Sequence, residues 1–274
     1  MKKILIALFL ISITNLSIAN EKKYIGFDWP ESVAEGIDGH IYVSEIGERD
    51  KDGDGKISRI DKDGNISTFA TGLNDPKGII FFKEKLYVTD RDVIIEVNKN
   101  GSWSILGAEM SFPKTPIFLN DIDVDSKGNF YITDTGNFKT GGIVFKMNLA
   151  GSINVLFDET HENNKAPNGV LPIGKNKILL LDWGGELFEA NTQTKKIRKL
   201  GDGFPGGDGL AIKNETIYIS SWKEGKIYEF KNGDSKVIAD GFEAAADIAL
   251  NRDKTHLIIP DMKAGTVTIL PIKK

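Results

Sequence analysis

The 274-residue chain contains no cysteine. It therefore has no disulfides, no thiol chemistry, no cysteine metal ligands and no lipid-attachment cysteine. It also lacks a serine nucleophile elbow, a phosphate-binding loop and a histidine-based zinc motif. Its net charge is only −4. Such an acidic, evenly mixed chain argues against nucleic acid as a partner, because that partner requires a basic face. No segment after the first twenty residues has a convincing helical pattern.

The N-terminus has the pattern of an export signal. Lys2 and Lys3 form a basic start, residues 4–13 are an apolar run, and Ser17 and Ala19 supply a small-x-small cleavage site. The run is too short for a good membrane span. We predict that residues 1–19 are a signal peptide and that the mature protein is exported, to the periplasm or beyond the cell, without stable membrane insertion. An uncleaved anchor is the alternative.

The rest of the chain repeats one unit six times. Each unit begins with a short apolar strand, and its second strand ends in an acidic residue or serine. Alternation such as Leu86-Tyr87-Val88 indicates strands, and turns such as Lys99-Asn100-Gly101 favour hairpins between them. In the second unit the expected strands cover residues 78–81, 85–89, 93–97 and 102–105.

Six four-stranded units, each about 45 residues long, predict a six-bladed β-propeller with antiparallel blades. We therefore expect residues 20–274 to form a single all-β domain. The last unit has room for only three strands after Ile248. We expect residues 24–27 to supply the missing outer strand and close the ring, which removes an open edge. A pair of β-sandwiches or a β-solenoid is the alternative.

One position of the repeat is rich in oxygen ligands. Aligned on the first apolar residue of each unit, it holds Glu31, Lys77, Asn120, Asn168, Asp208 and Ala246, here called the polar column. In a propeller the first strand of each blade lines the channel, so these side chains are expected to meet at one mouth. Two carboxylates and two carboxamides suit a hard divalent cation, Ca²⁺ more than Mg²⁺. Alternatively, Asn and Asp precede these strands because they form turns.

At this column the chain resembles a known family. The phrases are Pro30-Glu31-Ser32-Val33, Asn120-Asp121-Ile122, Pro167-Asn168-Gly169-Val170 and Asp208-Gly209-Leu210. They look like those of the gluconolactonase/regucalcin (senescence marker) family of six-bladed propellers, which is related to the paraoxonases. The resemblance implies that Glu31, Asn168 and Asp208 bind a divalent cation, with Asn120 at the metal or the substrate. It also implies hydrolysis of lactones and some esters, with Asp208 as the general base. The paraoxonase histidine pair has no counterpart.

Further candidates for substrate binding surround this mouth. Lys77 either steadies an anionic substrate or pairs with Glu31. Arg91, just after the second strand of the second unit, is the candidate for the family's substrate-binding arginine. Trp183 and Trp222 occupy matching positions in units four and five. They form walls for a sugar-like or apolar ligand, or else pack on neighbouring blades. His161 lies in a long loop on the same face, as a proton shuttle or a solvated histidine.

A second acidic cluster runs from Asp50 to Asp61. Asp50, Asp52, Asp54 and Asp61 stand at positions 1, 3, 5 and 12 of a calcium-loop spacing, with Gly55 at position 6. The pattern is similar to a dockerin-type loop and predicts a second, structural Ca²⁺. The alternative is an exposed acidic loop.

These features together predict an exported, Ca²⁺-type metal-dependent hydrolase of lactones or related esters. The cation would polarise the substrate carbonyl while a carboxylate activates water. The alternative is a non-enzymatic propeller that binds a small ligand or a protein partner and carries a structural cation.

Overall fold

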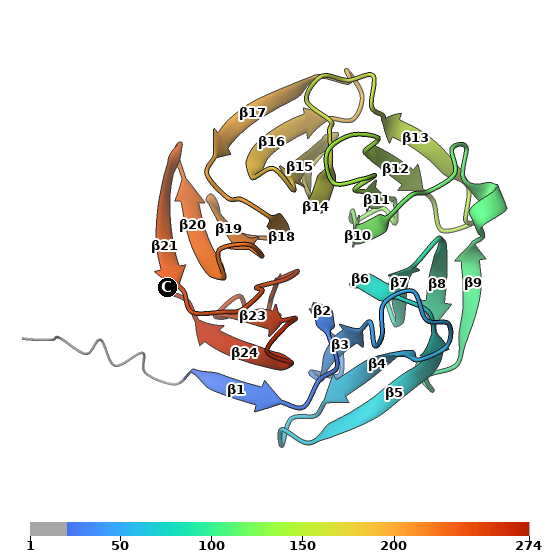
Figure 1. Cartoon of the computed structure of the whole chain (residues 1–274), viewed down its shortest axis with the longest axis vertical. Coiled ribbons are helices and arrows are strands. Elements are labelled where there is room, and N and C mark those ends of the chain that lie inside the picture. Colours follow the sequence, from blue (N-terminus) through green and yellow to red (C-terminus); the bar gives the residue numbers. More distant parts are fainter. Residues whose placement is uncertain (1–20, 274) are drawn as a thin grey trace, which may run out of the picture.

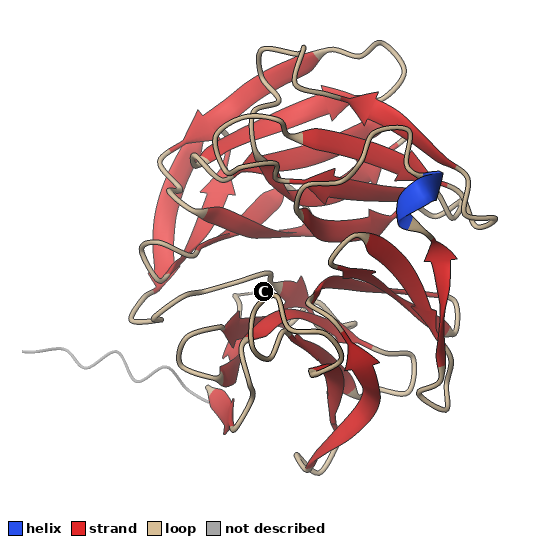
Figure 2. Cartoon of the chain, turned by 45° about the vertical axis from the view of Figure 1, so that its right-hand side comes forward, coloured by secondary structure: helices blue, strands red, loops and turns tan. Residues whose placement is uncertain are grey.

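The computed structural model describes residues 21–273, and the predicted signal peptide lies outside them. The described chain forms six four-stranded antiparallel sheets arranged as the blades of a ring (Figure 1). Its one helical segment is the short 3₁₀ turn Glu109–Ser111, the blue element in Figure 2. The prediction of an all-β, six-bladed propeller is confirmed. Within the described residues, no helix has the length and apolarity to cross a membrane.

Each blade runs from an inner strand at the channel to an outer strand at the rim. Blade one is β2 (Pro30–Glu35), β3 (Ile41–Glu45), β4 (Gly55–Ile60) and β5 (Ile66–Leu73). Blade two is β6 (Pro76–Phe82), β7 (Lys85–Asp90), β8 (Val93–Val97) and β9 (Trp103–Gly107). Blade three is β10 (Leu119–Val124), β11 (Phe130–Asp134), β12 (Ile143–Met147) and β13 (Ile153–Phe157). Blade four is β14 (Pro167–Gly174), β15 (Lys177–Asp182), β16 (Glu186–Asn191) and β17 (Ile197–Asp202). Blade five is β18 (Gly207–Lys213), β19 (Thr216–Ser221), β20 (Lys226–Lys231) and β21 (Asp234–Ala239). Blade six is β22 (Ala249–Leu250), β23 (His256–Asp261), β24 (Thr266–Pro271) and β1 (Lys22–Ile25).

The two ends of the described chain meet in blade six. β1 pairs antiparallel with β24, from Lys22 opposite Ile269 to Ile25 opposite Thr266 (Figure 1). The closing strand is thus confirmed, although it lies two residues earlier than residues 24–27. The shift has a local cause. Gly26 and Phe27 both donate their backbone N–H groups to the carbonyl of Gly265, and β1 ends before them.

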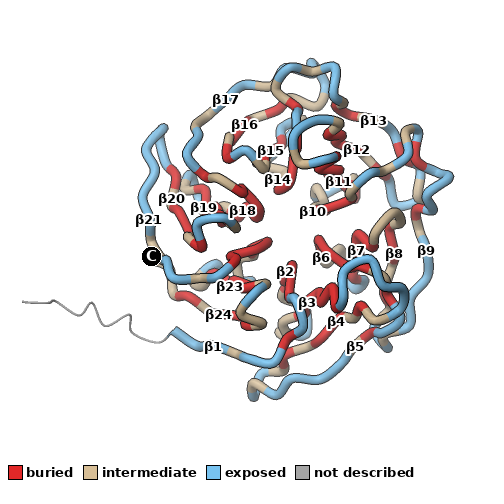
Figure 3. Tube along the Cα trace, viewed as in Figure 1, coloured by how far each residue is buried: buried red, intermediate tan, exposed pale blue. Residues whose placement is uncertain are grey.

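The apolar core lies between neighbouring blades. Figure 3 shows buried residues on the inner and middle strands, whereas the outer strands are largely exposed. Phe130 of β11 is fully buried and its ring centroid lies 4.5 Å from that of Tyr87 in blade two. Comparable clusters join the other blades, so the ring is held by apolar packing between successive sheets.

The acidic residue that ends a second strand ties the backbone at the mouth. These strand-end residues are Glu45, Asp90, Asp134, Asp182, Ser221 and Asp261. Asp134 is representative. Its carboxylate accepts backbone N–H groups from Ile117, Phe118 and Gly136 at 2.7–2.8 Å. The bonds from Ile117 and Phe118 satisfy amides in the segment that enters the inner strand and fix the start of that strand, and the bond from Gly136 fixes the turn after the second strand.

Each of the first five inner strands then contains an irregularity. Its first residue pairs with the strand-end residue, and the register shifts before its fourth residue, as between Pro167 and Val170. The second and third residues therefore leave the regular ladder. The third residue approaches the next blade closely, since a Cβ on Gly169 would lie 2.3 Å from the carbonyl oxygen of Asp208. The second residue is the member of the polar column.

The packing between blades two and three predicts how much stability is lost when a core side chain is removed there. We expect Phe130→Ala to lower the free energy of unfolding by about 3–5 kcal/mol, because it leaves a cavity between two sheets. Chemical denaturation measures this change. Met110→Ala is the control, since Met110 is 97% exposed. Equal effects of the two substitutions would contradict a core located between blades.

Candidate functional site

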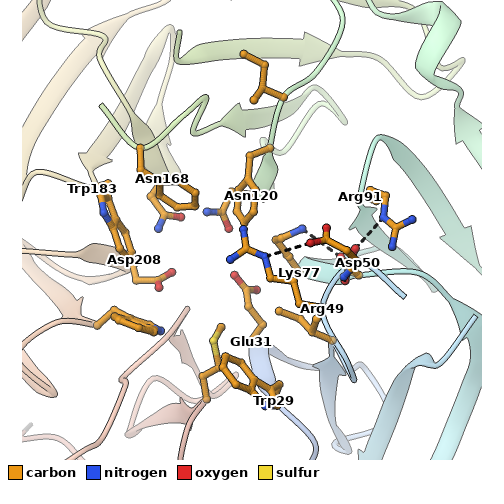
Figure 4. Close-up of a pocket in the computed structure, with 17 residues that line it drawn as sticks. Trp29, Glu31, Arg49, Asp50, Lys77, Arg91, Asn120, Asn168, Trp183 and Asp208 are labelled. Atoms are coloured by element: carbon orange, nitrogen blue, oxygen red, sulfur yellow. Dashed lines mark hydrogen bonds and ion pairs between the residues drawn. The ribbon is translucent and has the colours of Figure 1, made fainter. Parts of the chain in front are cut away.

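One mouth of the channel holds a cavity of about 370 Å³ to which all six blades contribute. Figure 4 shows it from above with its 17 lining residues. They are Trp29, Glu31, Ile46, Arg49, Asp50, Asp75, Lys77, Arg91, Ile117, Phe118, Asn120, Phe138, Asn168, Trp183, Asp208, Trp222 and Met262.

The polar column forms the floor of this cavity. Its first five members are the second residues of β2, β6, β10, β14 and β18, and all five are buried. The side chains of Glu31, Asn120, Asn168 and Asp208 point toward a common space (Figure 4). The structure therefore brings together the four residues that the sequence indicated, although they lie on four different blades. Ala246, in blade six, is not among the lining residues.

The four converging side chains have unsatisfied oxygens. Within residues 21–273, Glu31 Oε2, Asn120 Oδ1, Asn168 Oδ1 and Asp208 Oδ1 are buried without a hydrogen-bond partner. Asn120 is oriented by the bond from its Nδ2 to Thr135 Oγ1, 3.0 Å long. Leaving a buried acceptor unsatisfied costs about 1–3 kcal/mol. Four such oxygens at one point fit a hard cation, and Ca²⁺ accepts this mixture of carboxylate and carboxamide ligands.

The candidate metal ligands include carboxamides as an essential part. Across the described part of the chain, no three His, Asp or Glu side chains are grouped in a way that could hold a metal ion. Glu31 and Asp208 supply only two carboxylates, so Asn120 and Asn168 are needed to complete four protein oxygens. Water would fill the remaining positions of a calcium ion.

Burial and like charge act strongly on the carboxylates here. Burial raises the pKa of Glu31 well above its usual range, Asp208 raises it further, and Lys77 opposes the change. Burial also raises the pKa of Asp208, with Asp121 adding to the effect. Burial raises the pKa of Asp121 to about 7, against the hydrogen bonds donated by the Val170 and Ile122 amides. A bound cation would relieve this repulsion.

Lys77 is the one cation of the floor. Burial lowers its pKa, while the negative charge of Glu31 opposes that change. Its Nζ lies 4.4 Å from the ring centroid of Phe118 and donates to the carbonyl of Asp75 at 3.3 Å. No direct ion pair joins Lys77 and Glu31 in the described chain, although the charge of each acts on the pKa of the other. The ammonium group lines the cavity instead.

A repeated backbone bond places the walls above this floor. In blades one to five, the residue after the second strand donates its N–H to the carbonyl of the residue before the inner strand, and in blade six the acceptor lies further ahead of β22. The donors are Ile46, Arg91, Thr135, Trp183, Trp222 and Met262, and the acceptors are Trp29, Asp75, Phe118, Ala166, Gly206 and Ala244. All six donors except Thr135 line the cavity. Trp183 and Trp222 therefore stand over the mouth, as predicted from their matching positions.

The walls of blades three to five are aromatic. Phe118 lies 4.7 Å from Phe138, Phe138 lies 5.3 Å from Trp183, and Trp183 lies 5.7 Å from Trp222, between ring centroids. These four residues are called the aromatic wall. Sequence reasoning missed both phenylalanines. The position of Phe118 directly before an inner strand was an available signal. Phe138 has a left-handed backbone, with φ of 66°, which its sequence context did not indicate.

The side formed by blades one and two is charged. Arg49, Lys77 and Arg91, called the cationic wall, lie on one side of the floor, with Trp183 on the other (Figure 4). Arg91 donates from Nε to Asp75 Oδ2 at 2.7 Å and also pairs with Asp52. Its Nη2 is buried without an acceptor. Arg91 is held in a left-handed backbone conformation, with φ of 56°, a strain that is common at binding sites.

The four acids of the predicted second calcium loop are not gathered at one point in the structure. Residues Gly55–Ile60 form β4, and a strand of this length separates Asp61 from the other three acids by about 20 Å. Asp61 instead accepts the backbone N–H groups of Asp63 and Asn65 in the turn after β4. Asp52 pairs with Arg91, and Asp54 accepts the N–H of Glu48. The Asp50 amide donates to Asp75 Oδ1 at 3.0 Å. The loop is thus tied to blade two.

His161 lies away from the cavity lining. It occupies the loop between β13 and β14, where its Nδ1 accepts the N–H of Asn163 and its ring faces Phe157 at 6.0 Å between centroids. Its side chain does not line the cavity. Its position gives no support to a proton shuttle.

No family model and no curated protein sequence matches the chain. Solved structures do match it. A gluconolactonase from Xanthomonas campestris has a TM-score of 0.73 at 15% identity, covering 93% of this chain and 91% of that one. The calcium-binding protein regucalcin from Agrobacterium tumefaciens has a TM-score of 0.71 at 16% identity, covering 90% of each. A chain of a nidogen/laminin complex has a TM-score of 0.63 at 19% identity, covering 77% of this chain and 78% of that one. At these identities, the likeness shows that this chain shares their propeller fold.

Proposed function

We propose that the protein is an exported, divalent-metal-dependent hydrolase of lactones or related esters. The observation that carries this proposal is the convergence of four buried, unpartnered oxygens on the cavity floor. Ca²⁺ is the cation that suits them best. The similarity to structures described as a gluconolactonase and as a calcium-binding regucalcin supports both parts of the proposal.

Glu31, Asn168 and Asp208 would hold the ion, with Asn120 as the fourth protein ligand or a substrate contact. Bound there, a cation supplies polarisation of a carbonyl oxygen and stabilises the negative charge that develops on it. Lys77 adds a further positive charge beside the floor. The half-buried aromatic side chains above exclude bulk water, which strengthens each of these electrostatic interactions.

Asp208 is the proposed general base. Its carboxyl group is buried on the floor, and a carboxylate oxygen that does not bind the ion would be free to accept a proton. One carboxylate oxygen takes a proton from the attacking water while the water oxygen bonds to the carbonyl carbon. The bond from that carbon to the alkoxy oxygen then breaks. The alkoxy oxygen receives the proton from Asp208, which gives a carboxylic acid and an alcohol.

The competing function is binding without turnover. Ile117 and Trp29 line the mouth and are 63% and 45% exposed, so they offer apolar contact to a partner. In that case the cation would be structural. The similarity to a chain of a nidogen/laminin complex is compatible with this function.

The floor predicts one cation site per chain. After treatment with EDTA, we expect calorimetric titration with Ca²⁺ to give a stoichiometry near one. Glu31→Gln should weaken binding at least about tenfold, because it removes a charged ligand. Asp253→Asn, at an exposed turn, should leave the affinity unchanged. Binding that survives Glu31→Gln intact would contradict a site at the floor. A stoichiometry of two would contradict the separation of the acids between Asp50 and Asp61 and support a second calcium site there.

The mechanism predicts loss of turnover without loss of fold. On a panel of lactones and aryl esters, we expect Ca²⁺-dependent hydrolysis that EDTA abolishes reversibly. Asp208→Asn should lower kcat by about 10²–10⁴, the usual worth of a general base. Circular dichroism checks the fold, and Asp253→Asn is the matched control. Absence of metal-dependent turnover across the panel would favour the binding propeller.

The buried charge at Asp208 also predicts a pH-dependent stability in EDTA. Its pKa is raised in the folded protein, so its contribution to stability is present at low pH and is lost as the pH rises through the folded pKa. Removing the charge should therefore help most at alkaline pH. We expect chelated Asp208→Asn to melt about 3–8 °C above the unmodified chain at alkaline pH. The difference in melting temperature should become smaller as the pH falls toward the usual pKa range of aspartate. Equal melting temperatures at alkaline pH would show that this carboxylate is not destabilising.

A further inference from the structure

The cavity walls differ on their two sides. The aromatic wall (Phe118, Phe138, Trp183 and Trp222) is continuous, since successive ring centroids are 4.7–5.7 Å apart. All four side chains are only partly buried, so they are available to a ligand. Flat apolar groups stack on such surfaces and gain from edge contacts as well. This side therefore fits an aromatic or other flat, apolar ring.

The cationic wall (Arg49, Lys77 and Arg91) has unused hydrogen-bonding capacity. Arg91 Nη2 is buried with no acceptor, and the buried Lys77 ammonium donates only to one backbone carbonyl. Asp50 and Asp75 also line the cavity. Asp50 Oδ2 lies 3.9 Å from Arg49 Nε, and the two Asp75 oxygens accept from Arg91 and from the Asp50 amide. Unpaired donors of this kind require an acceptor. This side fits an anionic group.

More cations lie beside the aromatic wall. Lys223 Nζ lies 4.8 Å from the Trp183 ring centroid, and Lys263 Nζ lies 4.1 Å from that of Trp222. The whole chain has a net charge of −4, so this gathering of positive groups is local. Arg49, Lys77, Arg91, Lys223 and Lys263 together outnumber the four carboxylates of the lining, which are Glu31, Asp50, Asp75 and Asp208, and this excess favours anions at the mouth.

The walls are poorly equipped for a polyhydroxylated ring. None of the described residues lining the cavity is Ser, Thr, Tyr, Gln or His. The neutral hydrogen-bonding side chains are Asn120 and Asn168, which belong to the floor, and the indole N–H groups of Trp29, Trp183 and Trp222. A sugar lactone would place some of its hydroxyl groups against the aromatic ring faces, which do not replace their bonds to water, so only the indole N–H groups and the charged side chains of the opposite wall would be left to pair with them.

Resting on the proposed function, we propose that the substrate is an amphipathic anion. A flat apolar ring contacts the aromatic wall, a carboxylate contacts the cationic wall, and the lactone or ester carbonyl between them faces the floor. The volume of about 370 Å³ suits a small molecule of this kind. This substrate class differs from sugar lactones in both its ring and its charge.

Binding of three unreactive probes tests the proposal separately from turnover. The probes are 3-phenylpropanoate, 3-phenylpropanamide and gluconate, titrated calorimetrically into the mature protein with Ca²⁺ and again with EDTA. The EDTA arm removes any cation that could itself bind a carboxylate. We expect 3-phenylpropanoate to bind at least about tenfold more tightly than either other probe in both arms.

Variants assign the preference to the two walls. Arg49→Gln and Arg91→Gln should weaken 3-phenylpropanoate about tenfold and leave the amide within about twofold. Trp183→Leu should weaken both aryl probes alike. Arg198→Gln is the matched control, because Arg198 lies on the outer strand of blade four with 70% of its side chain exposed. Arg49 is exposed, so its variant keeps the test decisive if Arg91→Gln fails to fold.

Several outcomes would overturn the proposal. They are tighter binding of gluconate, equal binding of the carboxylate and the amide, no binding of 3-phenylpropanoate at millimolar concentration, and binding that requires Ca²⁺ and ignores both arginine variants. None of these results depends on hydrolysis. A protein that binds 3-phenylpropanoate in EDTA but never turns over a lactone would keep this inference and lose the proposed function.

Discussion

The site depends on confinement of like-charged and unpaired oxygens where the inner strands converge. Ring closure by β1 and β24 leaves the inner strands no freedom to move apart, and the irregularity at each strand start sets the polar column out of the ladder. Glu31 and Asp208 are therefore held almost fully buried at the base of the cavity. Burying charge without a partner is costly, and the interblade core must offset that cost. A bound cation would be coordinated by these carboxylates and would offset the repulsion between them.

Above the floor, the sixfold repeat is used asymmetrically. The backbone hydrogen bond from the residue after the second strand to a residue ahead of the inner strand recurs in all six blades. Which of these two residues has the larger side chain differs between blades. In blades four to six the large member follows the second strand, as Trp183 does, and the member before the inner strand is small, as Ala166 is. In blades one to three the larger or charged member often precedes the inner strand, as Trp29 and Phe118 do. The position that carries the large side chain therefore differs from blade to blade above a floor of common geometry.

The acidic segment at Asp50 shows the limit of local spacing as evidence. Its carboxylates stand at calcium-loop intervals, but the same residues also belong to a blade whose third strand begins at Gly55. Pairing with β3 extends that segment and carries Asp61 away from Asp50. One of the acids, Asp52, then pairs with a residue distant in sequence, Arg91. A spacing rule assumes that the whole segment forms a compact loop, but part of this segment forms a strand of the sheet.

The amino-acid sequence by itself determined the number of blades, their strand order and the polar column. Hydrophobic period, turn residues and a repeat of fixed length are local properties, and a ring of repeats has a single axis. The tertiary structure alone decided which oxygens lack partners, how Arg91 is shared between two loops and which rings form the aromatic wall. Phe118, Phe138 and Arg49 reach the cavity through backbone bends and contacts between blades. Those depend on side chains far apart in the sequence, and only the packed ring brings them into contact.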